Sequence, residues 1–145
     1  MDVTTIPFVE KVGIIRSSKG LLELPFNESI QNHLKTIHAG AQFALAETAS
    51  GEILQRIFPE LVGKVVPVLR EAHIKYKKPA IKTISGHPTI SDEAISKFKE
   101  QFKRKGRSTI SVNVEIKDSE NVVTCVSIFK WFVQSIEQIE TEQLH

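Results

Sequence analysis

The sequence predicts an α+β domain in which an antiparallel β-sheet wraps one long central helix, with an extra helix inserted between strands. Three observations predict this class. Residues 38–58 form one long helical pattern rich in small apolar residues, several strand-like segments follow it, and a capped helical segment at residues 91–105 separates two of these strands. The length of 145 residues suits one domain with a proper core. We expect a single domain over residues 1–145, with its core at about 10–133 and a polar, frayed tail at 134–145.

The central helix, HAGAQFALAETASGEILQRIF, ends before Pro59 because the residue preceding a proline is pushed out of the α region. Its many Ala, Gly and Ser residues would let a sheet approach closely. On a helical wheel Glu47 falls at roughly 140°, inside an apolar stripe that runs from about 20° to 160°. The sequence therefore predicts a carboxylate on the apolar side, with a glutamate that reaches out to water as the bland alternative. The helix places its other polar residues on the opposite side: Thr48, Glu52, Gln55 and Arg56.

Local patterns predict the remaining elements. A short helix is expected at residues 5–12, and LLELPF, after a turn at 17–20, reads as a short strand. The inserted helix begins after Ser91, which is a good N-cap, and stops at Gly106. Strands are expected at residues 64–78, 80–86, 108–118 and 121–133, the last two joined by a hairpin. This order of elements is the hotdog architecture.

Composition excludes several classes of function. The net charge is only +2, and no aromatic platform accompanies the basic residues, so nucleic-acid binding is not expected. The single cysteine, Cys125, lies in the apolar run VVTCVSIF and reads as a packed strand thiol. No segment has the length of a membrane span, and residues 1–13 lack the apolar block of a secretory signal. We expect a cytoplasmic protein that does not bind membranes.

Two motifs carry a resemblance to a known family. The pattern N-x5-HAG-x6-E resembles the helix motif of hotdog-fold acyl-CoA thioesterases of the phenylacetate-pathway (PaaI-like) type, and AHIKYKKPA at residues 72–80 resembles their third-strand motif. The similarity covers roughly residues 10–133. The inserted helix is similar to that of a related branch whose members mostly lack an assigned substrate. The helix motif consists of Asn32, His38, Ala39, Gly40 and Glu47.

The resemblance implies hydrolysis of an acyl-CoA thioester, with coenzyme A as part of the substrate and with no cofactor or metal. Glu47 would be the nucleophile or the general base, and the backbone N–H of Ala39 or Gly40 would form the oxyanion hole. Asn32 would orient the carbonyl or water, and His38 would form a hydrogen bond near the sulfur. The structural alternatives are that Asn32 caps a turn and that His38 caps the helix.

The resemblance also implies a homodimer with edge-to-edge sheets, with a homotetramer left open, and an active site between protomers. Leu69 stands where several relatives carry a Ser or Thr, and the helical wheel does not point Thr48 inward to replace it. A non-catalytic acyl-CoA-binding protein is therefore the alternative. A hotdog dehydratase is not expected, because the sequence lacks the His-containing loop of that class. Apolar residues Phe43, Leu54 and Phe58, with Leu69 nearby, are the expected substrate pocket. A basic group is expected to hold the coenzyme A phosphates, or else to be a solvated helix end: Lys103, Arg104, Lys105 and Arg107.

Overall fold

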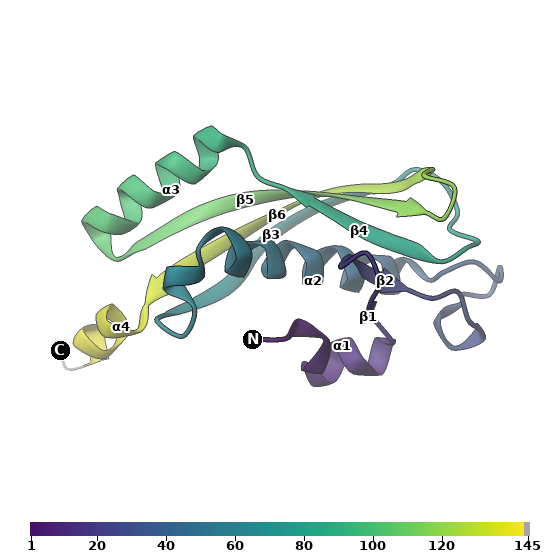
Figure 1. Ribbon diagram of the computed structural model, residues 1–145, viewed down its shortest axis with the longest axis horizontal. Helices are drawn as coiled ribbons and strands as arrows, with labels where there is room; N and C mark the ends of the chain where they lie inside the picture. Colours follow the sequence, from purple (N-terminus) through teal and green to yellow (C-terminus); the bar gives the residue numbers. More distant parts are fainter. Residues whose placement is uncertain (144–145) are drawn as a thin grey trace.

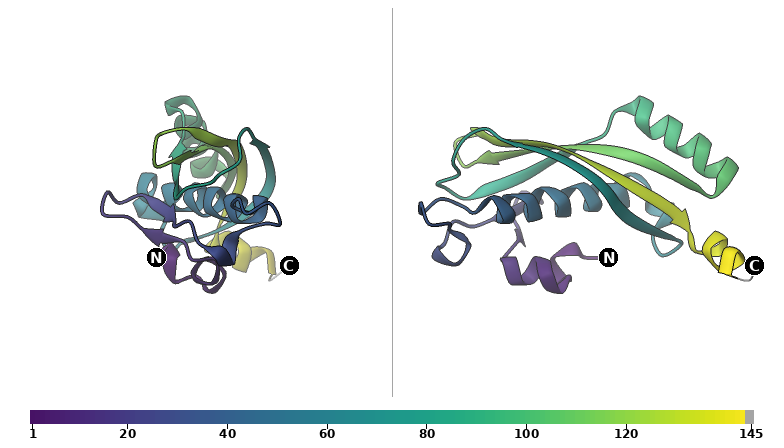
Figure 2. Two further views of the ribbon diagram at one scale, coloured as in Figure 1. Left: turned by 90° about the vertical axis from the view of Figure 1, so that its right-hand side faces the viewer. Right: turned by 180° about the vertical axis from the view of Figure 1, so that it is seen from behind.

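The computed structural model describes residues 1–143 and contains one antiparallel sheet that curves over a long central helix (Figure 1). The sheet has six strands in the order β1-β2-β4-β5-β6-β3. The central helix α2 spans Ala39–Ile57, and helix α1, Pro7–Val12, lies on the side of α2 that faces away from the sheet (Figure 2). The predicted arrangement of sheet and central helix is confirmed.

The strands follow the predicted segments with two differences. A short strand, β1, was not predicted, and β4 begins later than the expected 80–86 segment and runs on through Pro88. Gly86 does not end this strand because its role is to let the sheet approach α2: a Cβ atom there would lie 3.0 Å from the Cβ atom of Ala49. The bounds are Ile15–Arg16 (β1), Leu22–Leu24 (β2), Val65–Tyr76 (β3), Ile84–Thr89 (β4), Arg107–Asp118 (β5) and Val123–Ser135 (β6).

The inserted helix α3, Asp92–Lys105, is confirmed together with both of its caps. Ser91 Oγ accepts a hydrogen bond from the Ala94 N–H at 3.1 Å, and Gly106 takes a left-handed conformation with φ of 70°. The prediction of a frayed C-terminal tail was wrong for residues 136–143, because these residues form helix α4, Ile136–Gln143. The Gln138 side chain docks this helix by donating from Nε2 to the Lys105 carbonyl at 2.6 Å. Residues 144–145 lie outside the described part of the chain.

Helix α2 is buried on almost every side, so its predicted polar side was wrong in part. Thr48 and Glu52 are buried, whereas Arg56 is exposed as expected. The reason is the N-terminal segment, which covers this side of the helix and brings Arg16 into an ion pair with Glu52. On the opposite side the helix packs against the sheet, and residues 107–116 of β5 alternate between exposed and buried, so that one face of this strand points inward. Among residues 1–143 no helix has the length and apolarity needed to cross a bilayer.

Candidate functional site

A cavity of about 410 Å³ lies alongside the second half of α2. Its lining comes from α2, from the N-terminal segment, from the turn after α2, from the paired ends of β3 and β6, and from α3. Glu47 is the one ionisable side chain in this lining, and Thr48 and Gln55 are the other polar ones. The cavity is therefore apolar with a single carboxylate, an arrangement typical of small-molecule sites with few placed polar groups.

The Glu47 carboxylate is half-buried and forms no hydrogen bond or ion pair with the side chains or backbone of residues 1–143. Burial raises the pKa of the Glu47 carboxyl above its ordinary value, because desolvation disfavours the charged form. The predicted placement of this acid on the apolar side is thus observed. A carboxylate with a raised pKa is a stronger base once it is ionised, which suits proton abstraction from water.

The unusual pKa of Glu47 predicts how stability depends on pH. A carboxyl whose pKa is higher in the folded state binds more protons when folded, so the free energy of unfolding falls as pH rises through the two pKa values. We expect Glu47→Gln to be more stable than the wild type at neutral pH, and this gain to vanish at a pH below the ordinary carboxyl pKa. Urea unfolding of both proteins at the two pH values measures this, and equal midpoints at neutral pH would contradict it.

A hydrogen-bonded chain fixes the backbone of Glu47. The Trp131 indole Nε1 on β6 donates to Ser50 Oγ at 2.9 Å, and Ser50 Oγ donates to the Glu47 carbonyl at 2.7 Å. Trp131 also lines the cavity, and its ring lies against Gly51, where an added Cβ atom would be 3.3 Å from the ring. The sheet therefore determines where this turn of α2, and with it the carboxylate, stands in the cavity.

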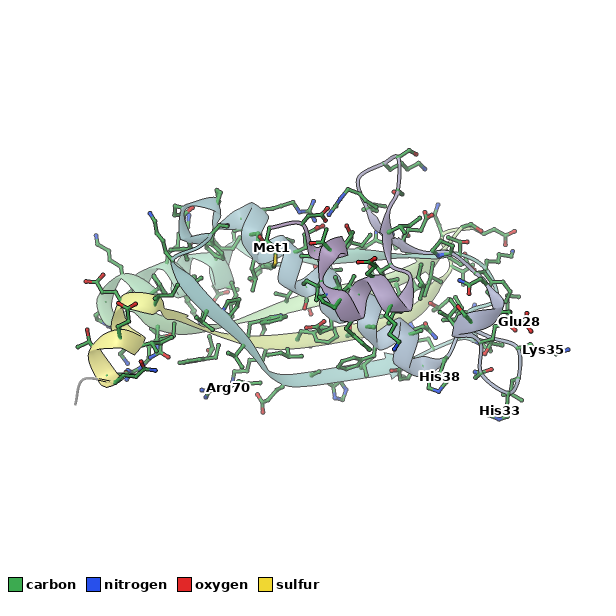
Figure 3. All side chains as sticks on the ribbon, turned by 90° about the horizontal axis from the view of Figure 1, so that it is seen from below. Met1, Glu28, His33, Lys35, His38 and Arg70 are labelled. Carbon is green, nitrogen blue, oxygen red and sulfur yellow. The ribbon has the colours of Figure 1, made fainter. Side chains whose placement is uncertain are left out.

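The start of α2 is a second, separate place. His38 is the N-cap: its Nδ1 accepts a hydrogen bond from the Gly40 N–H at 2.8 Å, which leaves the proton on Nε2. The Ala39 N–H has no acceptor among residues 1–143. His38 and Ala39 are both exposed. His38 lies where α2 begins, away from Met1, which lies against the C-terminal half of the helix and donates to Gln55 Oε1 at 2.9 Å (Figure 3). Of the two predicted oxyanion donors, Ala39 is the one that is free.

Asn32 stabilises the turn before α2. Its side-chain Oδ1 accepts from the backbone N–H groups of Leu34 and Thr36 at 2.9 and 3.1 Å, and its Nδ2 donates to Thr36 Oγ1 at 2.8 Å. These contacts correspond to the structural alternative for Asn32. They use its amide within the 32–36 turn, and Asn32 does not line the cavity.

One chain does not bring the predicted catalytic groups together. Gly40 and Glu47 are seven residues apart on the same helix, which corresponds to about 10 Å along its axis. A single thioester carbonyl is much smaller than this separation. For both groups to act on one substrate, Glu47 of one protomer would have to lie close to the start of α2 in a second protomer.

The predicted substrate pocket is present in part. Leu54 and Phe58 line the cavity, but Phe43 and Leu69 do not. Phe43 instead packs edge-on against Phe129 in the core, with ring centroids 5.4 Å apart. Leu69 pairs with Trp131 in the β3-β6 ladder just before the β-bulge. Phe43 was expected in the pocket together with Leu54 and Phe58, but which apolar side chains of α2 face the cavity depends on elements far away in the sequence.

The prediction that Thr48 points away from the interior was wrong. The helical wheel placed it away from the interior, yet it lines the cavity beside Glu47 and is 5% exposed. Its hydroxyl donates to the Ala44 carbonyl at 2.6 Å, which leaves its oxygen lone pairs able to accept a hydrogen bond.

The basic residues lie at the junction of α3 and β5, near the C-terminal end of α2. All four are exposed, none lines the cavity, and Arg107 forms an ion pair with Glu142 at 3.5 Å. Cys125 is fully buried, and burial raises the pKa of its thiol to about 11, as expected for a packed thiol.

Residues that the sequence analysis missed form much of the cavity. Trp131 and Phe98 line it from β6 and α3, and the N-terminal segment closes it with Val3 and Val9. Nothing in the local patterns linked residues 1–9 or α3 to Glu47, because these contacts join distant parts of the chain.

Solved structures of known proteins support this fold. PA5026 from Pseudomonas aeruginosa, described as a probable thioesterase, is 21% identical with a TM-score of 0.77, over 92% of this chain and 91% of that chain. Thioesterase HI1161 from Haemophilus influenzae is 19% identical with a TM-score of 0.70, over 92% and 87%. BH2602 from Bacillus halodurans, solved with CoA, is 23% identical with a TM-score of 0.62, over 81% and 70%.

At these identities the likeness concerns the fold, and the predicted α+β hotdog fold is confirmed. A search of curated protein sequences finds no match. The family described as a domain of unknown function, DUF4442, matches residues 4–133, which is most of the chain. The chain therefore belongs to the DUF4442 family.

Proposed function

We propose that this protein hydrolyses acyl-CoA thioesters, with Glu47 as the general base or nucleophile. The observation that carries the proposal is the half-buried, unpartnered carboxylate in an apolar cavity. Three further points support it: the helix motif of the phenylacetate-pathway type, thioesterases among the structures of similar fold, and a similar structure that was solved with CoA.

The acyl group occupies the cavity, so that its carbonyl carbon lies next to Glu47. The ionised carboxylate either removes a proton from a water molecule that attacks this carbon or attacks it directly, and the negative charge moves to the carbonyl oxygen. On the general-base route the tetrahedral intermediate collapses to the free acid, and the departing thiolate of coenzyme A takes up the proton that Glu47 removed from the water. On the direct route the thiolate leaves as the anhydride with Glu47 forms, and a water molecule then hydrolyses this anhydride to the free acid and restores the Glu47 carboxylate. Thr48 lines the same cavity, and its hydroxyl oxygen would accept a hydrogen bond from the attacking water.

The oxyanion hole comes from the start of α2 in a second protomer. Ala39 lies eight residues before Glu47 on the same helix, about 12 Å along its axis, so one chain does not supply both groups to one carbonyl. The unpaired Ala39 N–H and the helix dipole suit a developing negative charge. The long edge strand β3 offers a way to pair two protomers, because it bonds only to β6 within the described chain and exposes Val66 and Val68. The exposed residues Lys103, Arg104, Lys105 and Arg107 remain our candidates for the coenzyme A phosphates.

A proline at position 39 tests this site without disturbing the helix. Position 39 is the first helical residue, where proline is favoured, and the ψ of 139° at His38 is compatible with a following proline. We expect Ala39→Pro to lower kcat by about 100-fold to 1,000-fold while stability stays the same. The measurement is release of free thiol from a panel of acyl-CoAs.

Mixed protomers test whether the site is shared. Neither Ala39→Pro nor Glu47→Gln alone is active, but in a mixed dimer one of the two sites has both wild-type groups. Refolding the two variants together should restore about a quarter of the wild-type activity. No recovery, with sedimentation of the wild type as a single 16.3 kDa chain, would contradict a shared site.

The alternative is an acyl-CoA-binding protein without turnover, which the lack of a hydroxyl at Leu69 favours. Binding of acyl-CoAs by the wild type, with no thiol release from any of them, would support this alternative over the enzyme.

A further inference from the structure

The cavity is elongated along α2, which sets how an acyl group can lie in it. The lining residues of α2 recur at helical spacing along one side, from Glu47 through Gly51 and Leu54 to Phe58. Glu47 and Phe58 are eleven residues apart, which corresponds to about 16 Å. The reacting end of the cavity is at Glu47, so the other end is at Phe58.

Two phenylalanines close the far end. Phe58 is 3% exposed and Phe98 of α3 is 2% exposed, and their ring centroids lie 4.7 Å apart. Phe102 stacks behind Phe98 at 5.6 Å but does not line the cavity. Helix α3, which is inserted between β4 and β5, therefore supplies the end wall of the cavity.

The chemistry of the lining selects the acyl group. Beyond Glu47 and Thr48 the only polar side chain in the lining is Gln55, and the only cationic group is the Met1 ammonium, which already donates to Gln55 Oε1 at 2.9 Å. Several hydroxyls on the acyl group would lose their hydration here without gaining enough partners, and a carboxylate would also be repelled by ionised Glu47, which is unfavourable. A saturated hydrocarbon chain, by contrast, gains free energy with each methylene that it buries.

Length and volume agree on the size of this chain. An extended chain advances about 1.2 Å per bond, since a residue of three bonds spans about 3.6 Å, so a path of about 16 Å holds about a dozen bonds. The cavity of about 410 Å³ corresponds to roughly 14 groups of the size of a water molecule or a methylene, at about 30 Å³ each.

We infer that the cavity takes an unbranched, uncharged saturated acyl chain of about a dozen carbon atoms, and that Phe98 on α3 is the residue that limits its length. This inference rests on the proposed function for the direction in which the chain lies. The role of Phe98 as a stop rests on the cavity alone.

Binding to a protein that cannot turn over tests the inference independently of catalysis. In a Glu47→Gln background, the affinity for saturated acyl-CoAs of about 4 to 18 carbons should rise by up to about fourfold per methylene and level off near twelve. Adding Phe98→Ala should extend this rise by about three carbons, because removal of the ring lengthens the cavity. Phe102→Ala, on the same helix and outside the lining, is the matched control and should leave the profile unchanged.

The milder Phe98→Leu gives the same direction of change with a smaller loss of core packing, and it replaces Phe98→Ala if that variant does not fold. An unchanged limit in a folded Phe98 variant would overturn the inference, as would phenylacetyl-CoA binding tighter than every saturated chain. If the wild type hydrolyses acyl-CoAs but the limit does not move, the inference fails and the proposed function stands. If the limit moves but the wild type releases no thiol, the proposed function fails and the inference stands.

Discussion

Replacing Glu47 by glutamine should lower kcat for thioester hydrolysis by about 100-fold to 10,000-fold, the range expected for loss of a general base. If the carboxylate is the nucleophile, the loss should reach the upper end of this range or exceed it. The amide has nearly the same size as the acid and does not ionise, so the cavity keeps its shape while the base is lost. The rate of thiol release at saturating acyl-CoA measures the effect.

Glu60→Gln is the matched control for this substitution. Glu60 is exposed in the turn that follows α2 and does not line the cavity, so its loss should leave kcat unchanged. The activity of the wild type should also fall as the pH is lowered, because only the ionised form of Glu47 acts. The midpoint of this fall should lie above the ordinary carboxyl pKa, because burial raises the pKa of Glu47. An active Glu47→Gln protein would disprove the proposed role.

Replacing Trp131 by alanine should lower the free energy of unfolding by about 3 to 5 kcal/mol, which is the largest effect on stability that we expect from one site. The indole is 8% exposed, and its removal empties space against Gly51 and takes the hydrogen-bond donor from Ser50, which is fully buried. Urea unfolding followed by circular dichroism measures the loss.

Two variants separate the contributions of Trp131. Trp131→Phe keeps one aromatic ring but loses the Nε1 donor and the ring atoms that lie against Gly51, so it should cost about 1 to 3 kcal/mol, less than Trp131→Ala. Phe132→Ala removes the neighbouring aromatic ring, which is partly exposed under Arg70 on the other face of the sheet, and should cost less than Trp131→Ala. Equal losses in the free energy of unfolding for Trp131→Ala and Phe132→Ala would show that the position of Trp131 in the cavity wall does not explain its effect on stability.

The fold could be predicted from the sequence because its signals are local. The small residues and the proline stop of α2, the Ser91 and Gly106 caps of α3, and the alternation of β5 each belong to one segment. The C-terminal helix α4 was missed because its stability comes from contacts such as that between Gln138 and Lys105, not from an apolar stripe.

The candidate site could be predicted only in part. Glu47 stood out because it is out of phase with the other polar residues of its helix, a property of one segment. The burial of Glu52 could not be predicted, since it depends on Arg16, which is 36 residues away. The same holds for Phe98 and Trp131, which reach the cavity only through the pairing of strands and the return of α3.

The N-terminal segment forms one wall of the cavity, and outside its two-residue strand β1 it is not part of the sheet. It is therefore the portion of the enclosure that can detach while the ladders of β4, β5 and β6 remain intact. Transient opening of this wall would widen the way into the cavity without breaking the sheet. Backbone amides of α1 should accordingly exchange with deuterium sooner than those in the middle of α2, and occupancy of the cavity should slow that exchange.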